Sequence, residues 1–295
     1  MKIAILIHHP SIYIHKRFSE VGKERGHDIR FINISNCYMN ISATHPAVYY
    51  KSSEPIESVD AIIPRISPIR TFYGTAVLRQ LEIMGIYTLN SSLSITWCRD
   101  KFRMLQLLTR KHIPLPITGV ADSPEESEKL IDVVGGTPLI VRLLEGTEGR
   151  GTIFAETHQA AVSVINAFKQ LKTNILVQEY IQEANGSDIR CMVVGHKVIA
   201  SMQRNAPEAG GPHSHHPLRS SLPIKITAEE KKMAIKATKA MKLNFASVDL
   251  IRSNRGPLVL DVDSSPNIEI LEKVTEVDII SALMQFIEEN AKKPD

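Results

Sequence analysis

Three aspartates near the end of the chain have the spacing of a divalent-cation site. Asp261 and Asp263 alternate along the run 258–263, so an extended strand places both carboxylates on one face. The turn residues 254–256 fold this run back beside a strand that carries Asp249. Three carboxylates on two neighbouring strands repel one another unless a cation lies between them, and oxygen ligands suit Mg²⁺ or Mn²⁺. Three solvated aspartates at strand ends are the alternative.

A glycine-rich loop at residues 145–151 is the second candidate, with Gly146, Gly149 and Gly151 between two β-runs. Glycine lets the backbone approach a phosphate closely and direct its amides toward it. A glycine-rich hairpin turn is the alternative.

A third cluster spans two further extended runs. Glu179 and Tyr180 end one of them, and Asp188 and Arg190 open the next. This arrangement could hold a nucleoside and its phosphates, or it could be a strand edge with a surface ion pair. Spacing alone leaves both interpretations open.

The elements that must position these residues begin as a parallel α/β domain, for which we expect residues 1–90. Strands are expected at 3–7, 29–34, 61–66 and 87–90, and helices at 15–25 and 71–84. Strands separated by helices of this length imply a parallel sheet covered on both faces.

The remaining residues, 91–295, mix strands and helices in the manner of an α+β domain. A long amphipathic helix is expected at 94–111, and capping boxes at Ser123 and Thr227 predict two further helix starts. Gly195-His196 predicts a hairpin turn. The expected β-runs are 138–144, 152–155, 175–178, 189–194 and 197–202.

Composition narrows the class of protein. The chain has 295 residues, enough for two domains, and a net charge of +3, too small for a dedicated nucleic-acid binder. Its three cysteines are far apart and predict no disulfide, so a reducing cytoplasm is expected. No segment approaches the roughly 20 apolar residues of a membrane span, and the apolar N-terminal run is too short for a signal sequence.

In this order, the clusters resemble the RimK branch of the ATP-grasp ligases over nearly the whole chain. That resemblance implies a glutathione-synthetase-like ATP-grasp fold, with an N-terminal parallel α/β domain, a small lid at about 112–180, and a C-terminal ATP-binding domain. The segments that carry it are Cys37–Asn40, Pro64-Arg65-Ile66, residues 71–75, Arg99-Asp100-Lys101, residues 145–151, residues 178–181, Asp188-Ile189-Arg190 and residues 254–259.

The resemblance also implies residue roles. Lys101 and Arg142 would contact ATP phosphates, Glu179 and Tyr180 would flank the adenine, and Asp188 would hold the nucleoside. Asp249, Asp261 and Asp263 would bind two divalent ions, Mg²⁺ or Mn²⁺. The candidate cations beside the transferred phosphoryl group are Arg190 and Arg204.

The implied activity is ATP-dependent addition of glutamate to the C-terminal carboxylate of a protein or peptide through an acyl phosphate. The resemblance further implies a small-subunit ribosomal protein as acceptor and a homotetramer. A catalytically weakened, nucleotide-binding paralogue is the alternative. A ribosome- or RNA-binding protein without chemistry has only the mild positive charge in its favour.

The chain departs from the family where chemistry is expected, which supports the alternative, whereas the three carboxylates and the glycine-rich loop that it keeps favour the active ligase. The family has lysine where this chain has Arg142, and Glu and Asn where it has Asp261 and Asp263. It also has several arginines within the stretch 205–219, where this chain has three histidines and keeps only Arg219. We expect residues 205–219 to form a flap over the site that selects the acceptor.

Overall fold

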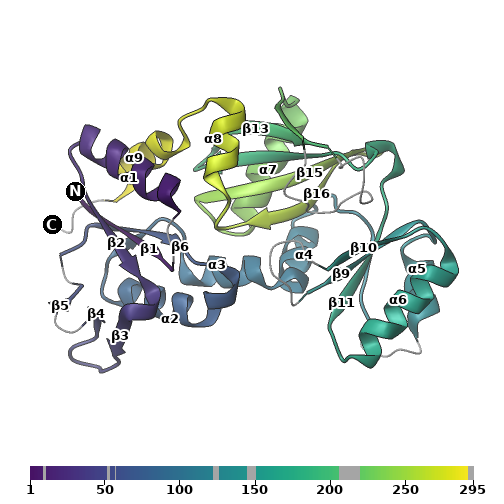
Figure 1. The fold of residues 1–295 in the computed structure, drawn as a ribbon, viewed down its shortest axis with the longest axis horizontal. Coiled ribbons are helices and arrows are strands. Elements are labelled where there is room, and N and C mark those ends of the chain that lie inside the picture. Colours follow the sequence, from purple (N-terminus) through teal and green to yellow (C-terminus); the bar gives the residue numbers. More distant parts are fainter. Residues whose placement is uncertain are drawn as a thin grey trace.

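The structure, a computed structural model, describes residues 1–8, 11–51, 54–56, 58–121, 126–144, 151–205 and 220–291, without the side chains of residues 54 and 127. Three sheet-based units follow one another along the chain (Figure 1). A parallel sheet opens it, a small antiparallel sheet with two helices comes next, and a larger antiparallel sheet follows. This confirms the expected fold class of a parallel α/β domain followed by antiparallel α+β units.

The N-terminal sheet is parallel throughout, in the order β2-β1-β6-β7. Alternate residues of β1 enter different cores: Ile3 and Ile5 pack with α1 and α9 (Ile279–Asn290), whereas Ala4 and Leu6 pack with α2 and α3. A parallel sheet covered on both faces requires this pattern of continuous apolar strands. The elements are β1 (Lys2–Ile7), α1 (Ile12–Glu24), β2 (Asp28–Asn33), β6 (Ala61–Arg65), α2 (Thr71–Ile83), β7 (Tyr87–Thr88) and α3 (Ser92–Arg99).

A three-stranded antiparallel sheet extends this domain and is absent from the sequence-based expectations. It consists of β3 (Cys37–Asn40), β4 (Ala47–Tyr50) and β5 (Glu54–Pro55). These strands are too short for alternation to show, and stacking of Tyr38 on Tyr49 contributes to their pairing.

The single helix expected at 94–111 is wrong, because the chain forms two helices there. Helix α3 ends at Arg99, and α4 (Lys101–Arg110) begins after Asp100, whose ψ of 98° is extended. The Asp100 side chain accepts a hydrogen bond from the Arg103 amide and so caps α4. Lys101 therefore begins a helix rather than lying inside one.

The small antiparallel sheet has the order β10-β9-β11-β8, and α5 and α6 cover one face of it. Leu139, Val141 and Val177 point toward those helices, which leaves Arg142 on the opposite face. The predicted cap at Ser123 lies outside the described residues. The elements are β8 (Thr118–Gly119), α5 (Ser127–Val133), β9 (Leu139–Leu143), β10 (Thr152–Ala155), α6 (His158–Gln170) and β11 (Ile175–Glu179).

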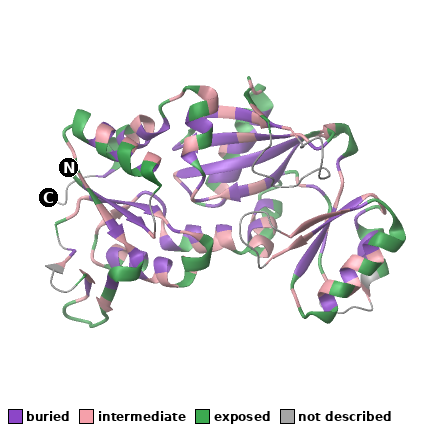
Figure 2. Ribbon diagram, in the orientation of Figure 1, coloured by how far each residue is buried: buried purple, intermediate pink, exposed green. Residues whose placement is uncertain are grey.

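The large sheet has the order β14-β13-β12-β15-β16 and is antiparallel. The predicted turns at residues 195–196 and 254–255 and the Thr227 capping box are confirmed. Most residues of the central strands β12 and β15 of this sheet are buried (Figure 2). The elements are β12 (Asp188–Val194), β13 (Lys197–Arg204), β14 (Ser221–Pro223), α7 (Ala228–Ala240), β15 (Phe245–Ser253) and β16 (Gly256–Asp263).

The two faces of the large sheet differ in chemistry. Ile189, Cys191 and Val248 pack on α7 and α4, while Arg190 and Asp249 alternate with them onto the opposite face. A register shift between Asp249 and Leu250 leaves one residue of β16 unpaired between Val259 and Asp261. Such a bulge re-aims the following side chains, and here Asp261 follows it.

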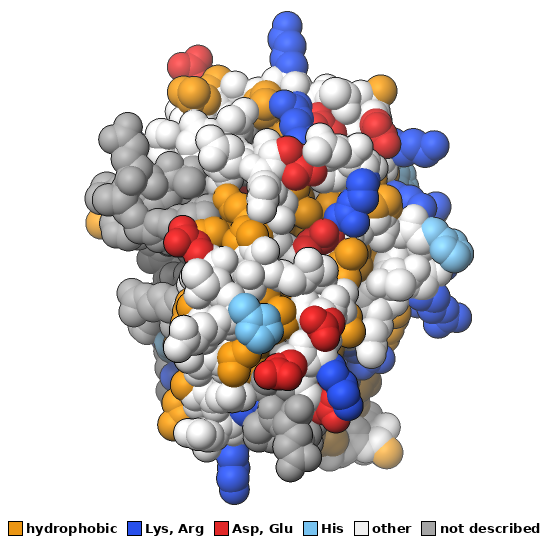
Figure 3. Space-filling model, turned by 90° about the vertical axis from the view of Figure 1, so that its right-hand side faces the viewer, with side chains coloured by type: hydrophobic (Ala, Val, Ile, Leu, Met, Phe, Trp, Pro, Cys, Tyr) orange, Lys and Arg blue, Asp and Glu red, His pale blue; other side chains and the backbone are white. Residues whose placement is uncertain are grey.

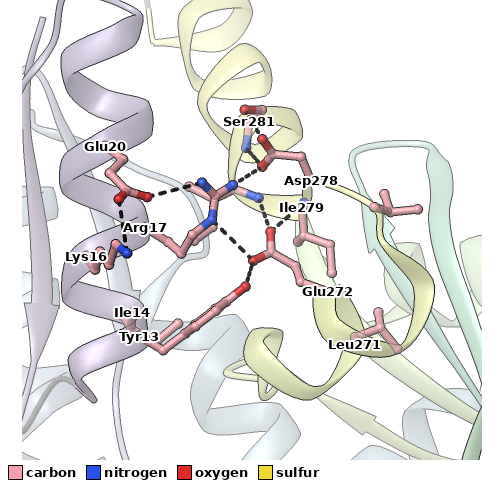
Figure 4. A network of polar contacts seen from close by, with 12 residues as sticks. Tyr13, Ile14, Lys16, Arg17, Glu20, Leu271, Glu272, Asp278, Ile279 and Ser281 are labelled. Carbon is pink, nitrogen blue, oxygen red and sulfur yellow. Dashed lines mark hydrogen bonds and ion pairs between the residues drawn. The ribbon is translucent and has the colours of Figure 1, made fainter.

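Helices α8 (Ile268–Thr275) and α9 (Ile279–Asn290) join the first and last parts of the chain. Glu272 of α8 accepts hydrogen bonds from the Tyr13 hydroxyl of α1 at 2.5 Å and from the Ile279 amide at 2.7 Å (Figure 4). Arg17 of α1 lies 3.7 Å from Glu272 and pairs with Asp278 at 3.0 Å. The N-terminal domain is thereby fixed to the C-terminal helices.

Figure 3 looks onto the side formed by α5, α6 and their sheet, where basic, acidic and apolar side chains are mixed on the described surface. No helix in the described part of the chain has both the length and the apolar character to cross a membrane.

Candidate active site

A cleft of about 1230 Å³ lies where the three units meet. The carboxyl ends of β1 and β6, the inner face of β9 to β11 and the polar face of the large sheet all contribute to it. Within the described residues its lysine, arginine, aspartate and glutamate lining side chains are Arg65, Arg99, Lys101, Arg142, Arg190, Arg204, Asp261, Asp263 and Glu269.

Two arginines from neighbouring strands share one aspartate at the floor of the cleft. Arg190 donates to both Asp249 oxygens, Nε to Oδ1 at 2.8 Å and Nη2 to Oδ2 at 2.7 Å. Arg204 donates Nη2 to Asp249 Oδ2 at 2.8 Å and Nε to Asp188 Oδ1 at 2.5 Å. The sheet register explains the network, because Asp188 lies opposite Arg204 and Arg190 lies opposite Asp249.

Burial and charge act in opposition in this network. Burial raises the pKa of Asp249, but Arg190 and Arg204 outweigh it and hold that pKa far below its ordinary value. Burial lowers the pKa of Arg204, but Asp249 and Asp188 outweigh it and raise that pKa above the ordinary arginine value. Asp249 and Arg204 therefore stay charged near neutral pH. The Nη1 atoms of Arg190 and Arg204 have no hydrogen bond with any described residue, so both can meet an anion in the cleft.

The rim of the large sheet carries two further ion pairs. Lys101 Nζ, at the start of α4, contacts Asp261 Oδ1, and Arg99 Nη1 lies 3.7 Å from Asp263 Oδ1. Both aspartate side chains are about one-third exposed, at 32% and 31%. The end of α3, the start of α4 and the end of β16 therefore place two cations beside two carboxylates at the cleft.

Arg142 comes from β9 on the opposite wall. It lines the cleft, its Nε is fully buried, and it forms no ion pair with a described residue. Burial lowers its pKa, although Asp261 and Asp188 act against that shift. A half-buried cation whose Nε is buried without a partner among the described residues is costly, which is typical of a site that binds an anion.

The three predicted metal ligands lie on one face but do not form one cluster. Asp249 is opposite Asp261 in the ladder. Asp249, however, is occupied by two arginines, and the described residues contain no group of three potential metal ligands. The Oδ2 atoms of Asp261 and Asp263 accept no hydrogen bond within the described residues. Two carboxylates that are about one-third exposed, each with one oxygen free of hydrogen bonds to described residues, fit Mg²⁺ that is shared with a nucleotide, because Mg²⁺ uses one or two carboxylates plus phosphates.

The residues assigned to the adenine lie outside the cleft lining. Glu179 contacts Arg255 and accepts a hydrogen bond from the Ile117 amide at 2.6 Å. Tyr180 packs against Phe154 with ring centroids 4.8 Å apart, and burial raises the pKa of Tyr180. Asp188 is buried beneath Arg204. The nucleoside roles of these three residues stay predictions.

Part of the predicted site cannot be placed. Gly151 lines the cleft, with a φ of 109°, whereas Gly146 and Gly149 lie outside the described residues. Of the segment 205–219, only Asn205 is described, and its amide donates to the Ser220 carbonyl at 3.0 Å. The flap prediction and the predicted role of Arg219 lie outside the described residues.

Sequence reasoning gave no role to Arg65 and Arg99, which the structure places in the cleft. A signal for Arg65 was present, because it directly follows a continuous apolar strand. In open parallel sheets, ligands bind at the carboxyl ends of the strands.

Solved structures with the same architecture define the class of protein. The structure matches the ATP-grasp ligase PsnB, complexed with a phosphomimetic precursor variant, Mg and ADP, with a TM-score of 0.77 at 19% identity over 98% of both chains. It also matches a RimK domain protein ATP-grasp from Sphaerobacter thermophilus, with a TM-score of 0.70 at 18% identity over 98% of this chain and 100% of that one. The fold is that of the ATP-grasp enzymes.

Sequence relatives narrow the class. Residues 1–95 match the RimK PreATP-grasp domain and residues 98–287 match the RimK-like ATP-grasp domain. Relatives described as "Probable alpha-L-glutamate ligase" are 49% identical in Legionella pneumophila over 99% of this chain and 97% of theirs, and 52% identical in Hydrogenovibrio crunogenus over the same shares. The chain belongs to the RimK-like ATP-grasp family.

Proposed function

We propose that the protein is an ATP-dependent alpha-L-glutamate ligase that adds glutamate to the C-terminal carboxylate of a protein or peptide. The observation that carries the proposal is the cleft, where cations from all three units surround two open carboxylates. The relatives in Legionella pneumophila and Hydrogenovibrio crunogenus, which are 49% and 52% identical over 99% of this chain, support the same activity. ATP, an acceptor carboxylate and glutamate are all anionic, so a cleft of this kind can hold them together.

Phosphoryl transfer comes first in this reaction. An oxygen of the acceptor carboxylate attacks the γ-phosphorus of ATP, ADP leaves, and an acyl phosphate forms. Arg142 and Lys101 contact the phosphates, and Arg190 and Arg204 direct their Nη1 groups at the charge that builds on the transferred group. Their carboxylate anchors fix both guanidinium groups in advance, which is the preorganisation that electrostatic catalysis requires.

Amide formation follows. The amine of glutamate attacks the acyl carbon, phosphate leaves, and the amine loses a proton as the amide forms. Asp261 and Asp263 are the proposed ligands of Mg²⁺ or Mn²⁺. Asp249, which the resemblance also implies as a ligand, lies opposite Asp261 and accepts hydrogen bonds from Arg190 and Arg204. Bound divalent cations would neutralise phosphate charge there. The use of two ions rests on the family resemblance.

The identity of the acceptor is the finer part of the proposal. A small-subunit ribosomal protein as acceptor and a homotetramer rest on the family resemblance alone, and a cytoplasmic location rests on the cysteine pattern of the sequence. The altered stretch 205–219 supports a weaker preference for a glutamate-rich acceptor, because it has fewer arginines than the family.

Mass spectrometry of candidate acceptors, incubated with ATP, Mg²⁺ and glutamate, tests the activity. A mass increase of one or more glutamyl units, together with ADP release, supports it. The Arg190→Gln variant is the control and should release no ADP. Nucleotide binding without glutamate-dependent ADP release would instead identify a catalytically weakened paralogue.

A further inference from the structure

Arg65 is a half-buried cation that the mechanism above does not use. It is the last residue of β6, opposite Ile7 at the end of β1, and it lines the cleft from the N-terminal wall. Its Nε and Nη1 are fully buried and have no hydrogen-bond partner among the described residues. It also forms no ion pair with any of them. Burying a guanidinium in this way is costly unless an anion meets it.

The neighbouring arginine, Arg99, adds to the cost of placing the Arg65 charge there. Arg99 is anchored by the Ile66 carbonyl, to which its Nη2 donates at 2.7 Å. Burial lowers the pKa of Arg65 to about 10, the attraction of Asp263 opposes that shift, and the repulsion of Arg99 adds to it. Arg65 therefore stays charged near neutral pH, next to a second cation.

The backbone around Arg65 also favours an anion. Ser11, the N-cap of the 13-residue helix α1, and Thr71, the first residue of the 13-residue helix α2, both line the cleft. Neither helix has an acidic residue in its first turn. The positive ends of two helix dipoles thus lie on the same wall as the unpaired guanidinium.

The position of Arg65 separates it from phosphoryl transfer. Arg142 lies on β9 in the opposite wall of the cleft, and Lys101 contacts Asp261. Arg65 ends β6 in the N-terminal wall, where the C-terminal residue of α3, Arg99, also lines the cleft. The acceptor carboxylate must reach the γ-phosphate, so it belongs with Arg142 and Lys101. The remaining substrate is the amino acid, so we assign one of its carboxylates to the N-terminal wall.

We propose that Arg65 binds a carboxylate of the incoming amino acid, and that this contact, with Arg99 beside it, selects an acidic amino acid and orients its amine toward the acyl phosphate. This proposal rests on the proposed function. Arginine suits the role because its planar fork can donate two hydrogen bonds to one carboxylate.

Steady-state kinetics on Arg65→Gln test this assignment. The KM for glutamate should rise by a factor of about ten or more, the effect typical of a lost charged hydrogen bond. The dissociation constant for ATP and the KM for the acceptor should stay within twofold of wild type. Arg65→Lys should recover part of the loss, because it restores charge without the fork. Glutamine, which lacks the side-chain carboxylate of glutamate, shows which carboxylate Arg65 binds. If Arg65 binds the side-chain carboxylate, Arg65→Gln should discriminate less than wild type between glutamate and glutamine.

The matched control is Arg70→Gln. Arg70 is an exposed arginine on the same domain that does not line the cleft, so its variant should behave as wild type. Arg65→Gln should also melt at or above the wild-type temperature, because it removes a charged group whose Nε and Nη1 are buried without a partner among the described residues. A lower melting temperature with an unchanged KM for glutamate would indicate a structural role. A rise in the KM for the acceptor instead would place a different substrate at Arg65.

A direct binding measurement separates this proposal from the proposed function. If wild type shows no glutamate-dependent ADP release, the proposed function fails. Calorimetric titration of glutamate, with Mg²⁺ and ADP present, still tests Arg65. Binding to wild type that is lost in Arg65→Gln and kept in Arg70→Gln supports the carboxylate site, and equal binding to all three, or none to wild type, overturns it.

Discussion

At the scale of single residues, the cleft contains two kinds of arginine. Arg190 and Arg204 are held by aspartates behind them, so their charge is balanced before any ligand arrives. Arg65 and Arg142 have no such partner among the described residues. The first pair is fixed in direction and suits a transition state, while the second pair gains most from a bound anion.

Arg142 tests whether arginine replaces the family's lysine at the nucleotide. We expect Arg142→Ala to weaken ATP binding by a factor of about 10 to 100, because a charged hydrogen bond is lost. Arg142→Lys should bind ATP as well as wild type or better, since it keeps the charge. Equilibrium titration with a non-hydrolysed ATP analogue measures both. Wild-type affinity in the alanine variant would exclude a phosphate contact.

Asp249 is expected to matter for stability as well as for turnover. Asp249→Asn should lower the free energy of unfolding by about 3 kcal/mol, because it leaves Arg190 and Arg204 buried beside a neutral group. Asp261→Asn is the comparison: its side chain is 32% exposed, so it should unfold like wild type while losing turnover. Urea denaturation distinguishes the two, and equal stability of both variants would contradict the role of Asp249 in the network.

The same network predicts a pH dependence. The pKa of Asp249 is depressed in the folded protein, so its contribution is fully present above the unfolded-state value of about 4 and declines as pH falls below it. Wild type should lose stability below about pH 4 more steeply than Asp249→Asn. Parallel denaturation series from pH 6 to pH 3 measure the difference, and identical slopes would contradict it.

At the scale of elements, much of the fold could be predicted because local signals coincide with tertiary demands. The glycine turns and the Thr227 capping box end or begin elements where expected. The break at Asp100 could not be predicted, because an aspartate inside an amphipathic pattern caps a helix only when the tertiary structure turns the chain there. The β-bulge before Asp261 shows no sequence signal, yet it turns that carboxylate to the cleft.

The sequence predicted only part of the site, because some of its geometry depends on strand register, which has no local signal. Strand alternation places Arg190 and Asp249 on one face, but only the register pairs Asp249 with two arginines instead of leaving it open to a cation. Arg65 differs from these cases, because its place at the carboxyl end of a predicted parallel strand is a sequence signal for a ligand-binding residue.

Helix α8 connects the cleft wall to the interdomain contact. Glu272 is 7% exposed and accepts hydrogen bonds from Tyr13, Ile279 and Ile280. Glu272→Ala should lower the free energy of unfolding by about 3 kcal/mol, and Tyr13→Phe by about 1 kcal/mol. Lys16→Ala, which removes an exposed pair with Glu20, is the control and should change stability by less than about 0.5 kcal/mol. Denaturant titration measures all three, and a Glu272→Ala loss no larger than the control would mean that the network does not hold the domains.

At the scale of the whole molecule, one cleft collects residues from all three units. A ligand bound there contacts each unit, so it should stabilise the folded chain as a whole. Binding at 100 times the dissociation constant adds about 2.7 kcal/mol to the free energy of unfolding. The metal contributes to that gain only if carboxylates at the cleft hold it.

Removing Mg²⁺ therefore tests the metal site through stability rather than turnover. Wild type with ATP and Mg²⁺ should melt at a higher temperature than with ATP and a chelator, because the cation neutralises phosphates beside Asp261 and Asp263. In Asp261→Asn and Asp263→Asn, this Mg²⁺-dependent increment should shrink or vanish, while ATP alone still stabilises through Arg142. Asp132→Asn, an exposed aspartate of α5 away from the cleft, should keep the full increment. Thermal unfolding of the four proteins under both conditions gives the answer. An undiminished increment in both cleft variants would mean that the cation is held by the nucleotide alone.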